Sequence, residues 1–190
     1  QRQQEFLQQR NVKLKVYGIA NSKALLLDEK GIDLSQWQQQ MQQAKAKFSV
    51  ADLSRFAQEQ HLTNPVLIDC SSAEPVANLY VDFLKAGFHV VTPNKKANTG
   101  SLDYYHQLRQ VAQQHRRRFL YETTVGAGLP VIDTLQGLFN AGDELVAFEG
   151  ILSGSLSYIF GLLEQGQSLS EVTTKARELG FTEPDPRDDL

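Results

Sequence analysis

The densest group of charged side chains lies near the carboxyl end of the sequence, where four acids and one arginine fall within residues 183–189. Pro184 and Pro186 stiffen this stretch and disfavour both helix and strand. A rigid acidic loop can clamp an ammonium group, bind a metal ion or take part in proton transfer. A charged surface turn explains the same residues, so both interpretations stay open.

Two other groups of polar residues follow short apolar runs, residues 66–69 and 88–91, which we predict to be parallel strands. Two serines, the first of them Ser71, follow the earlier run. There they let an anionic ligand approach the backbone at a helix start. Lys95 and the lysine after it follow the later run, where they could hold phosphate or carboxylate, or stabilise an alkoxide. A helix N-cap by either serine and a solvated basic turn are the alternatives.

Ser22 and Lys23 follow the first predicted strand, residues 13–20. Nucleotide-binding folds that prefer NAD place an acid near the end of their second strand, where it holds the ribose hydroxyls. The first acid here is Asp28, so Ser22 and Lys23 could instead accept the 2′-phosphate of NADP. An ordinary polar turn is the alternative, and the fingerprint GxGxxG occurs nowhere in residues 1–190.

Residues 123–130 form a loop of small residues, TTVGAGLP. Its backbone can offer carbonyl groups to a hard cation or amides to an anion. A tight crossover between domains, which needs glycine for its dihedral angles, is the alternative.

Strand and helix patterns alternate from residue 13 to residue 122, which is typical of a parallel α/β sheet. The pattern changes near residue 123, where we place a domain boundary. Beyond it we expect a helix starting at Pro130, a strand over 144–152 and two further helices, the last ending at Gly180.

Composition excludes several classes of protein. The net charge is −3, whereas a general nucleic-acid binder shows a basic excess. The single cysteine, Cys70, excludes an internal disulfide framework and fits a reducing, cytoplasmic location. No apolar run is long enough to span a bilayer, and residues 1–10 lack the apolar core of a signal peptide. Both ends fall in polar segments, so we expect a fragment of a longer chain.

Three stretches taken together resemble one family: TPNKKA at 92–97, ETTVGAGLPVI at 122–132 and GFTEPDPRDDL at 180–190. The family is homoserine dehydrogenase, and ANSKALL at 20–26 is similar to the form fused behind an aspartate kinase in bacteria. The resemblance covers essentially the whole chain.

This resemblance implies interconversion of L-homoserine and L-aspartate 4-semialdehyde by hydride exchange with NADP or NAD, in threonine and methionine biosynthesis. It implies a Rossmann-like NAD(P)-binding domain at residues 1–122, without its first strand and glycine loop, and the start of an α+β substrate and dimerisation domain at 123–190. A homodimer or higher oligomer, an aspartokinase domain in the same parent chain and a sodium ion are further implied; nucleic acid and membrane are not expected as partners.

The resemblance also implies roles for individual residues. Lys95 reaches the active site and Ser71 contacts the cofactor, while Gly180 lies by the nicotinamide. Glu183 binds the substrate's amino group, with Asp189, Gly154 and Ser155 also at the substrate. The sodium ion is held mostly by backbone groups, which map to Glu122, Val125, Ala127 and Leu129.

The sequence departs from the family at two points. Phe181 stands where a tyrosine is common, which removes a hydroxyl group. The motif of the family continues past Leu190 to the main proton-transfer lysine, so we expect a polypeptide limited to these 190 residues to have little or no activity. A non-catalytic regulatory or oligomerisation module, and an oxidoreductase for another amino-acid aldehyde, are the competing hypotheses.

Overall fold

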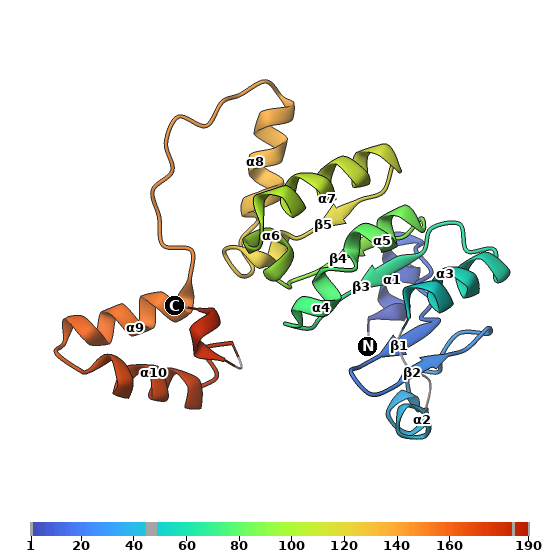
Figure 1. The fold of residues 1–190 in the computed structure, drawn as a ribbon, viewed down its shortest axis with the longest axis horizontal. Helices are drawn as coiled ribbons and strands as arrows, with labels where there is room; N and C mark the ends of the chain where they lie inside the picture. Colours follow the sequence, from blue (N-terminus) through green and yellow to red (C-terminus); the bar gives the residue numbers. More distant parts are fainter. Residues whose placement is uncertain (1, 45–48, 184, 190) are drawn as a thin grey trace. The chain divides into compact units, whose positions relative to one another are not determined.

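The computed structural model describes residues 2–44, 49–183 and 185–189. The chain forms two compact units, Gln1–Pro65 and Val66–Leu190. Figure 1 shows the path of the chain through its helices and strands.

The first unit contains a two-stranded hairpin and three helices: α1 (Gln3–Arg10), β1 (Gly18–Ala20), β2 (Leu25–Leu27), α2 (Trp37–Gln43) and α3 (Val50–Glu59). β1 and β2 pair antiparallel, with Ile19 opposite Leu26. The side chain of Asn21 reverses the chain between them, because its Oδ1 accepts hydrogen bonds from the backbone N–H groups of Lys23 (2.8 Å) and Ala24 (2.9 Å). The predicted strand over 13–20 is therefore confirmed only at its last three residues, and its partner is a hairpin strand.

The second unit contains a parallel three-stranded sheet in the order β3 (Val66–Ile68), β4 (His89–Val91), β5 (Phe119–Leu120). Leu67 pairs with Val90, and Val91 pairs with Leu120. The prediction of parallel strands after Pro65 and at 88–91 is thus confirmed. Val66 and Ile68 are exposed, however, because they share the face of β3 opposite to Leu67.

Four helices accompany this sheet: α4 (Glu74–Ala77), α5 (Tyr80–Lys85), α6 (Lys96–Thr99) and α7 (Leu102–Gln114). The segment between β3 and β4 forms two short helices, α4 and α5. α5 packs on β4 and on α7. The largest fully buried hydrophobic side chains around this sheet are Tyr80, Phe83, Leu84, Val90 and Leu108.

The remaining elements are η1 (Glu122–Thr124), α8 (Val131–Asn140), α9 (Gly154–Glu164), α10 (Leu169–Glu178) and η2 (Pro186–Asp188). α9 and α10 pack against each other through Ile159, Val172 and Ala176. Ser168 begins α10 with a reciprocal capping box that includes Glu171.

The predicted strand over 144–152 is wrong. This segment runs between α8 and α9 without regular structure (Figure 1), and Val146 and Ile151 are 96% and 79% exposed. A strand needs backbone partners on a neighbouring strand. Among the described residues, none pairs with this segment.

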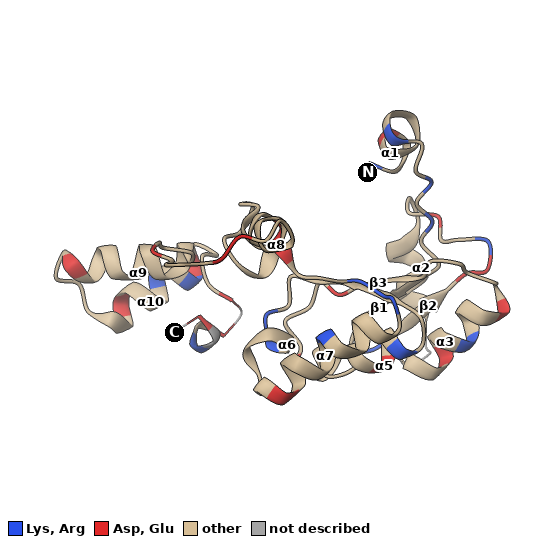
Figure 2. Cartoon of the chain, turned by 90° about the horizontal axis from the view of Figure 1, so that it is seen from above, with Lys and Arg blue, Asp and Glu red and all other residues tan. Residues whose placement is uncertain are grey.

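Charge is mixed along the chain rather than gathered in one sign (Figure 2). The longest basic run, residues 116–118, leads into β5, and acidic residues 143, 144 and 149 follow α8. No helix within the described part of the chain combines the length and apolar character that crossing a membrane requires.

Candidate functional site

A pocket of about 380 Å³ lies at the carboxyl ends of β3 and β4. Ligands bind at this edge in open parallel sheets because the loops that follow adjacent strands meet there. The pocket is lined by Cys70, Ser71, Ser72, Pro93, Asn94, Lys95, Lys96, Thr99 and Glu183. Three of the predicted site residues, Ser71, Lys95 and Glu183, therefore share one pocket.

Ser71 is held by the side chain of Asp69. Its N–H and its hydroxyl donate to Oδ1 of Asp69 at 2.8 Å and 2.6 Å. The predicted N-cap by a serine is wrong, since the N-cap of α4 is Ala73, which makes no side-chain cap. Ser71 Oγ instead accepts from the Ala73 N–H at 3.3 Å and stays at the pocket wall.

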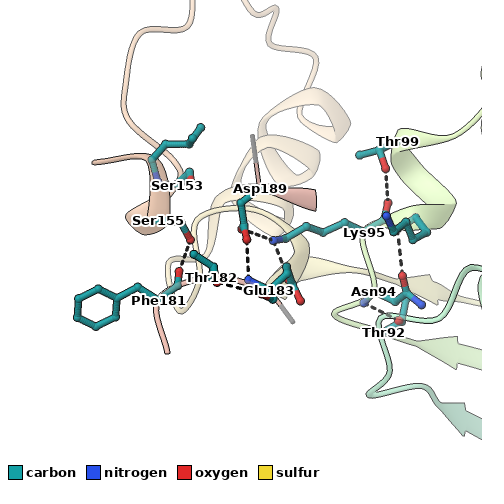
Figure 3. A network of polar contacts seen from close by, with 12 residues as sticks. Thr92, Asn94, Lys95, Thr99, Ser153, Ser155, Phe181, Thr182, Glu183 and Asp189 are labelled. Carbon is teal, nitrogen blue, oxygen red and sulfur yellow. Dashed lines mark hydrogen bonds and ion pairs between the residues drawn. The ribbon is translucent and has the colours of Figure 1, made fainter. Parts of the chain in front are cut away.

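Lys95 and the acidic loop come together although they are 88 residues apart in the sequence. Nζ of Lys95 lies 3.0 Å from Oε1 of Glu183 and 3.9 Å from Oδ1 of Asp189 (Figure 3). The Asp189 side chain is only 4% exposed, and its Oδ2 accepts the Glu183 N–H at 2.6 Å. Asp189 thus closes the loop and orients Glu183 toward the lysine.

Asp185 of this loop plays a separate part. Asp185 pairs with Arg187 through both of its carboxylate oxygens. The hydrogen bonds from Arg187 lower the pKa of Asp185 to about 2. The loop therefore divides into an inner pair, Glu183 and Asp189, and an outer ion pair at the surface.

Gly154, Ser155 and Gly180 flank this loop. Gly154 is the first residue of α9, whose cap is Ser153. The Ser155 hydroxyl donates to the Phe181 carbonyl, which ties the start of α9 to the segment leading to Glu183 (Figure 3). Gly180 has a φ of +73°, in the left-handed region, where the chain turns out of α10.

The expected cation-binding residues lie in the loop before α8. The Glu122 carboxylate accepts the N–H groups of Ile132 (3.0 Å) and Asp133 (2.7 Å) and so caps that helix. Ala127 has a φ of +51°, and the Leu129 carbonyl accepts the Val131 N–H at 2.9 Å.

These contacts still allow cation binding by the loop, because each carbonyl oxygen has two lone pairs and hard cations prefer oxygen ligands. The donor chemistry of Glu122, Val125, Ala127 and Leu129 therefore fits a monovalent cation. No cluster of three or more acidic, histidine or cysteine side chains suited to a metal is found among the residues that the structure describes.

Lys23 lines a separate pocket of about 590 Å³ within the first unit. Trp37 and Met41 of α2 line it as well, together with Asn21. Ser22, its predicted companion, is not one of the lining residues. The helical spacing of Trp37 and Met41 was visible in the sequence, but it did not indicate a pocket.

Sequence reasoning also assigned no role to three buried polar residues in and next to the pocket at the sheet edge. Asp69, Thr92 and Asn94 are 5%, 1% and 3% exposed. The position of Asp69 at the end of an apolar run was the available signal, because a carboxylate there needs polar partners in the fold.

The parallel sheet with a polar pocket at its carboxyl edge defines a nucleotide-binding α/β protein of the Rossmann-like class. A family model described as "Homoserine dehydrogenase, NAD binding domain" matches residues 2–122, and one described as "Homoserine dehydrogenase" matches residues 130–190. The chain belongs to the homoserine dehydrogenase family.

Similar proteins agree with this membership. The chain is 60% identical over its whole length to "Bifunctional aspartokinase/homoserine dehydrogenase" of Haemophilus influenzae and 50% identical to the protein of that name from Buchnera aphidicola. It spans 23% of the length of each of these relatives. A homoserine dehydrogenase structure from Thermoplasma acidophilum matches with a TM-score of 0.71 at 25% identity, covering 98% of this chain and 58% of that one.

Proposed function

We propose that the chain is the NAD(P)-binding domain, residues 1–122, and the start of the substrate domain, residues 123–190, of a homoserine dehydrogenase fused to an aspartokinase. The observation that carries this proposal is the convergence of Glu183 and Asp189 on Lys95 at the sheet edge. This arrangement suits a substrate that carries an ammonium group, as homoserine does, because Glu183 can pair with that group.

Each inner residue has a task that follows from its chemistry. Glu183 pairs with the substrate ammonium, and Asp189 holds Glu183 in place through the backbone N–H. Lys95 stabilises the developing alkoxide and assists transfer of the hydroxyl proton, with the main proton-transfer lysine expected past Leu190. In the structure, the ammonium group of Lys95 forms an ion pair with Glu183. The substrate ammonium replaces the lysine ammonium in this pair when it binds. Lys95 is then free to turn toward the substrate hydroxyl.

A nicotinamide cofactor fits the pocket because hydroxyl and ammonium groups line it; when bound, it supplies the hydride acceptor or donor. Ser71 and Lys95 would hold it at the sheet edge, with Gly180 near the nicotinamide. Lys23, in the pocket of the first unit, supports NADP because its ammonium group suits a 2′-phosphate. A structure similar in fold, at 23% identity, is titled a hyperthermophilic archaeal homoserine dehydrogenase in complex with NADPH.

The remaining expectations stay proposals. They are a homodimer or higher oligomer, sodium in the loop at 122–129, and an aspartokinase domain in the same chain, which the names of the bacterial relatives support. A cytoplasmic location stays a prediction, and several plant relatives carry names that end in "chloroplastic".

The test is NADPH formation by the full-length protein with NADP and L-homoserine, in the presence of sodium or potassium. 4-Hydroxybutanoate, which has the same hydroxyl and carboxylate but no ammonium group, serves as the matched substrate. We expect turnover with L-homoserine and at least tenfold lower kcat/KM with the analogue. A folded full-length protein that oxidises neither substrate would refute the proposal and favour a regulatory module.

A further inference from the structure

A buried carboxylate accepts hydrogen bonds from two residues that line the pocket, Ser71 and Asn94. Asp69 follows β3 and accepts hydrogen bonds on both of its oxygens. The Ser71 N–H and hydroxyl donate to Oδ1, while the Tyr80 hydroxyl and Nδ2 of Asn94 (3.1 Å) donate to Oδ2. All four partners are donors, so they satisfy an ionised carboxylate, which accepts only.

Asn94 extends this network to the loop that carries Lys95. Its Nδ2 also donates to the Ala73 carbonyl at 3.1 Å, and its Oδ1 accepts the Lys96 N–H at 3.0 Å. The backbone on either side of Lys95 is therefore anchored, through one amide side chain, to Asp69 and to the start of α4.

Thr92 closes the network from β4. Its hydroxyl donates to the Asp69 carbonyl (3.1 Å), accepts the Asn94 N–H (2.8 Å) and lies 2.9 Å from the Tyr80 hydroxyl. Burial and the hydrogen bond to Asp69 raise the pKa of Tyr80, so its hydroxyl keeps its proton and remains a donor.

We propose that Asp69, with Tyr80 and Thr92, is a positioning group that fixes the Ser71 and Lys95 loops in the geometry for cofactor binding and proton transfer. This inference rests on the proposed function. Burying a charge is costly, and an apolar contact at this point would hold β3 and β4 together without that cost. The hydrogen bonds of the polar network are directional, whereas an apolar contact is not. These hydrogen bonds fix the positions of the two loops that line the pocket.

The sharpest test uses two matched pairs in the full-length protein. Thr92→Val keeps the shape and removes the hydroxyl, whereas Thr92→Ser keeps the hydroxyl and removes a methyl group. Tyr80→Phe removes a hydroxyl from the network, whereas Tyr104→Phe removes one that donates to the Ala77 carbonyl of α4 and makes no hydrogen bond to Asp69 among the described residues. Thermal melts confirm that each variant is folded at the assay temperature.

The network predicts a specific pattern in the kinetics. Thr92→Val and Tyr80→Phe should raise KM for NADP at least fivefold and lower kcat at least fivefold, while Thr92→Ser and Tyr104→Phe stay within twofold of the wild type. If each pair instead shows equal changes, or if Thr92→Ser is the more damaging of its pair, the residues serve packing alone and the inference is overturned.

Cys70 provides a readout that does not depend on turnover, since it is an exposed thiol between Asp69 and Ser71 and lines the pocket. We expect iodoacetamide to alkylate Cys70 at least fivefold faster in Thr92→Val and Tyr80→Phe than in their partners, as measured by peptide mass mapping. Equal rates in all four variants would contradict a positioning role. A wild type without homoserine oxidation would refute the proposed function, and the alkylation rates would still decide this inference.

Discussion

Replacing Lys95 with methionine separates the two tasks that the site assigns to this residue. Methionine keeps the length and apolar stem of the side chain but has no ammonium group, so it can neither stabilise an alkoxide nor pair with Glu183. Removing one group that stabilises negative charge developing in the transition state lowers kcat by roughly 10²- to 10³-fold. We expect kcat for L-homoserine oxidation to fall by that range.

The same substitution should slightly strengthen the binding of L-homoserine, although it lowers kcat. Lys95 Nζ lies 3.0 Å from Glu183, with the two side chains 43% and 33% exposed. Ion pairs this accessible contribute about 0–1 kcal/mol, which corresponds to at most about a fivefold change in an equilibrium constant. Because the substrate ammonium no longer competes with a lysine, KM for L-homoserine should stay unchanged or fall up to about fivefold.

Steady-state kinetics of the full-length protein measure both parameters. Lys85→Met, a change of the same type at an exposed lysine of α5, is the control and should alter neither parameter by more than twofold. A Lys95→Met variant with wild-type kcat would refute the stabilisation of the alkoxide by Lys95. A variant whose KM rises tenfold or more would refute competition for Glu183.

Three further predictions concern other parts of the chain. Burial and the nearby Arg117 and Arg118 lower the pKa of His89, whose Nδ1 accepts the Arg118 N–H at 2.9 Å. The unfolded state then binds the proton more tightly, so stability is fully present above about pH 6.5 and falls as the pH drops toward the folded pKa. Melting temperatures should show this loss, and His89→Gln should reduce it. Glu122→Ala should lower the free energy of unfolding by about 1–2 kcal/mol through the lost cap of α8, as urea titration would measure. Lys23→Ala should raise KM for NADP several-fold more than KM for NAD, and equal changes would contradict its role at a 2′-phosphate.

Sequence patterns within single segments predicted the parallel strands β3 and β4, but they did not predict the β1–β2 hairpin or the irregular segment at 144–152. Short apolar runs bounded by turn residues identified β3 and β4, because such runs carry their own boundaries. The hairpin of β1 and β2 depends on hydrogen bonds to the side chain of Asn21, which hydrophobic periodicity does not reveal. The strand expected at 144–152 required a neighbouring strand to supply its backbone hydrogen bonds. The pattern of apolar residues within one segment does not show whether such a neighbour exists.

In the candidate site, too, the sequence indicated single residues but not their contacts in the folded chain. Each of Ser71, Lys95 and Glu183 could be singled out from its residue type and neighbours, but only the resemblance to homoserine dehydrogenase placed them at one active site. Lys95 and Glu183 meet across 88 residues, a separation that periodicity does not address. Asp69 escaped notice because its partners Tyr80 and Asn94 come from different loops and helices, so its network exists only in the folded chain.

The most direct test of the account is the preference for L-homoserine over 4-hydroxybutanoate, measured as a ratio of kcat/KM values in Glu183→Gln and Asp185→Asn. Both changes remove one negative charge from the same loop, but Asp185 pairs with Arg187 while Glu183 faces Lys95. The account predicts that the preference falls at least tenfold in Glu183→Gln and is retained in Asp185→Asn. An undiminished preference in Glu183→Gln, or an equal loss in both variants, would contradict recognition of the substrate ammonium by Glu183.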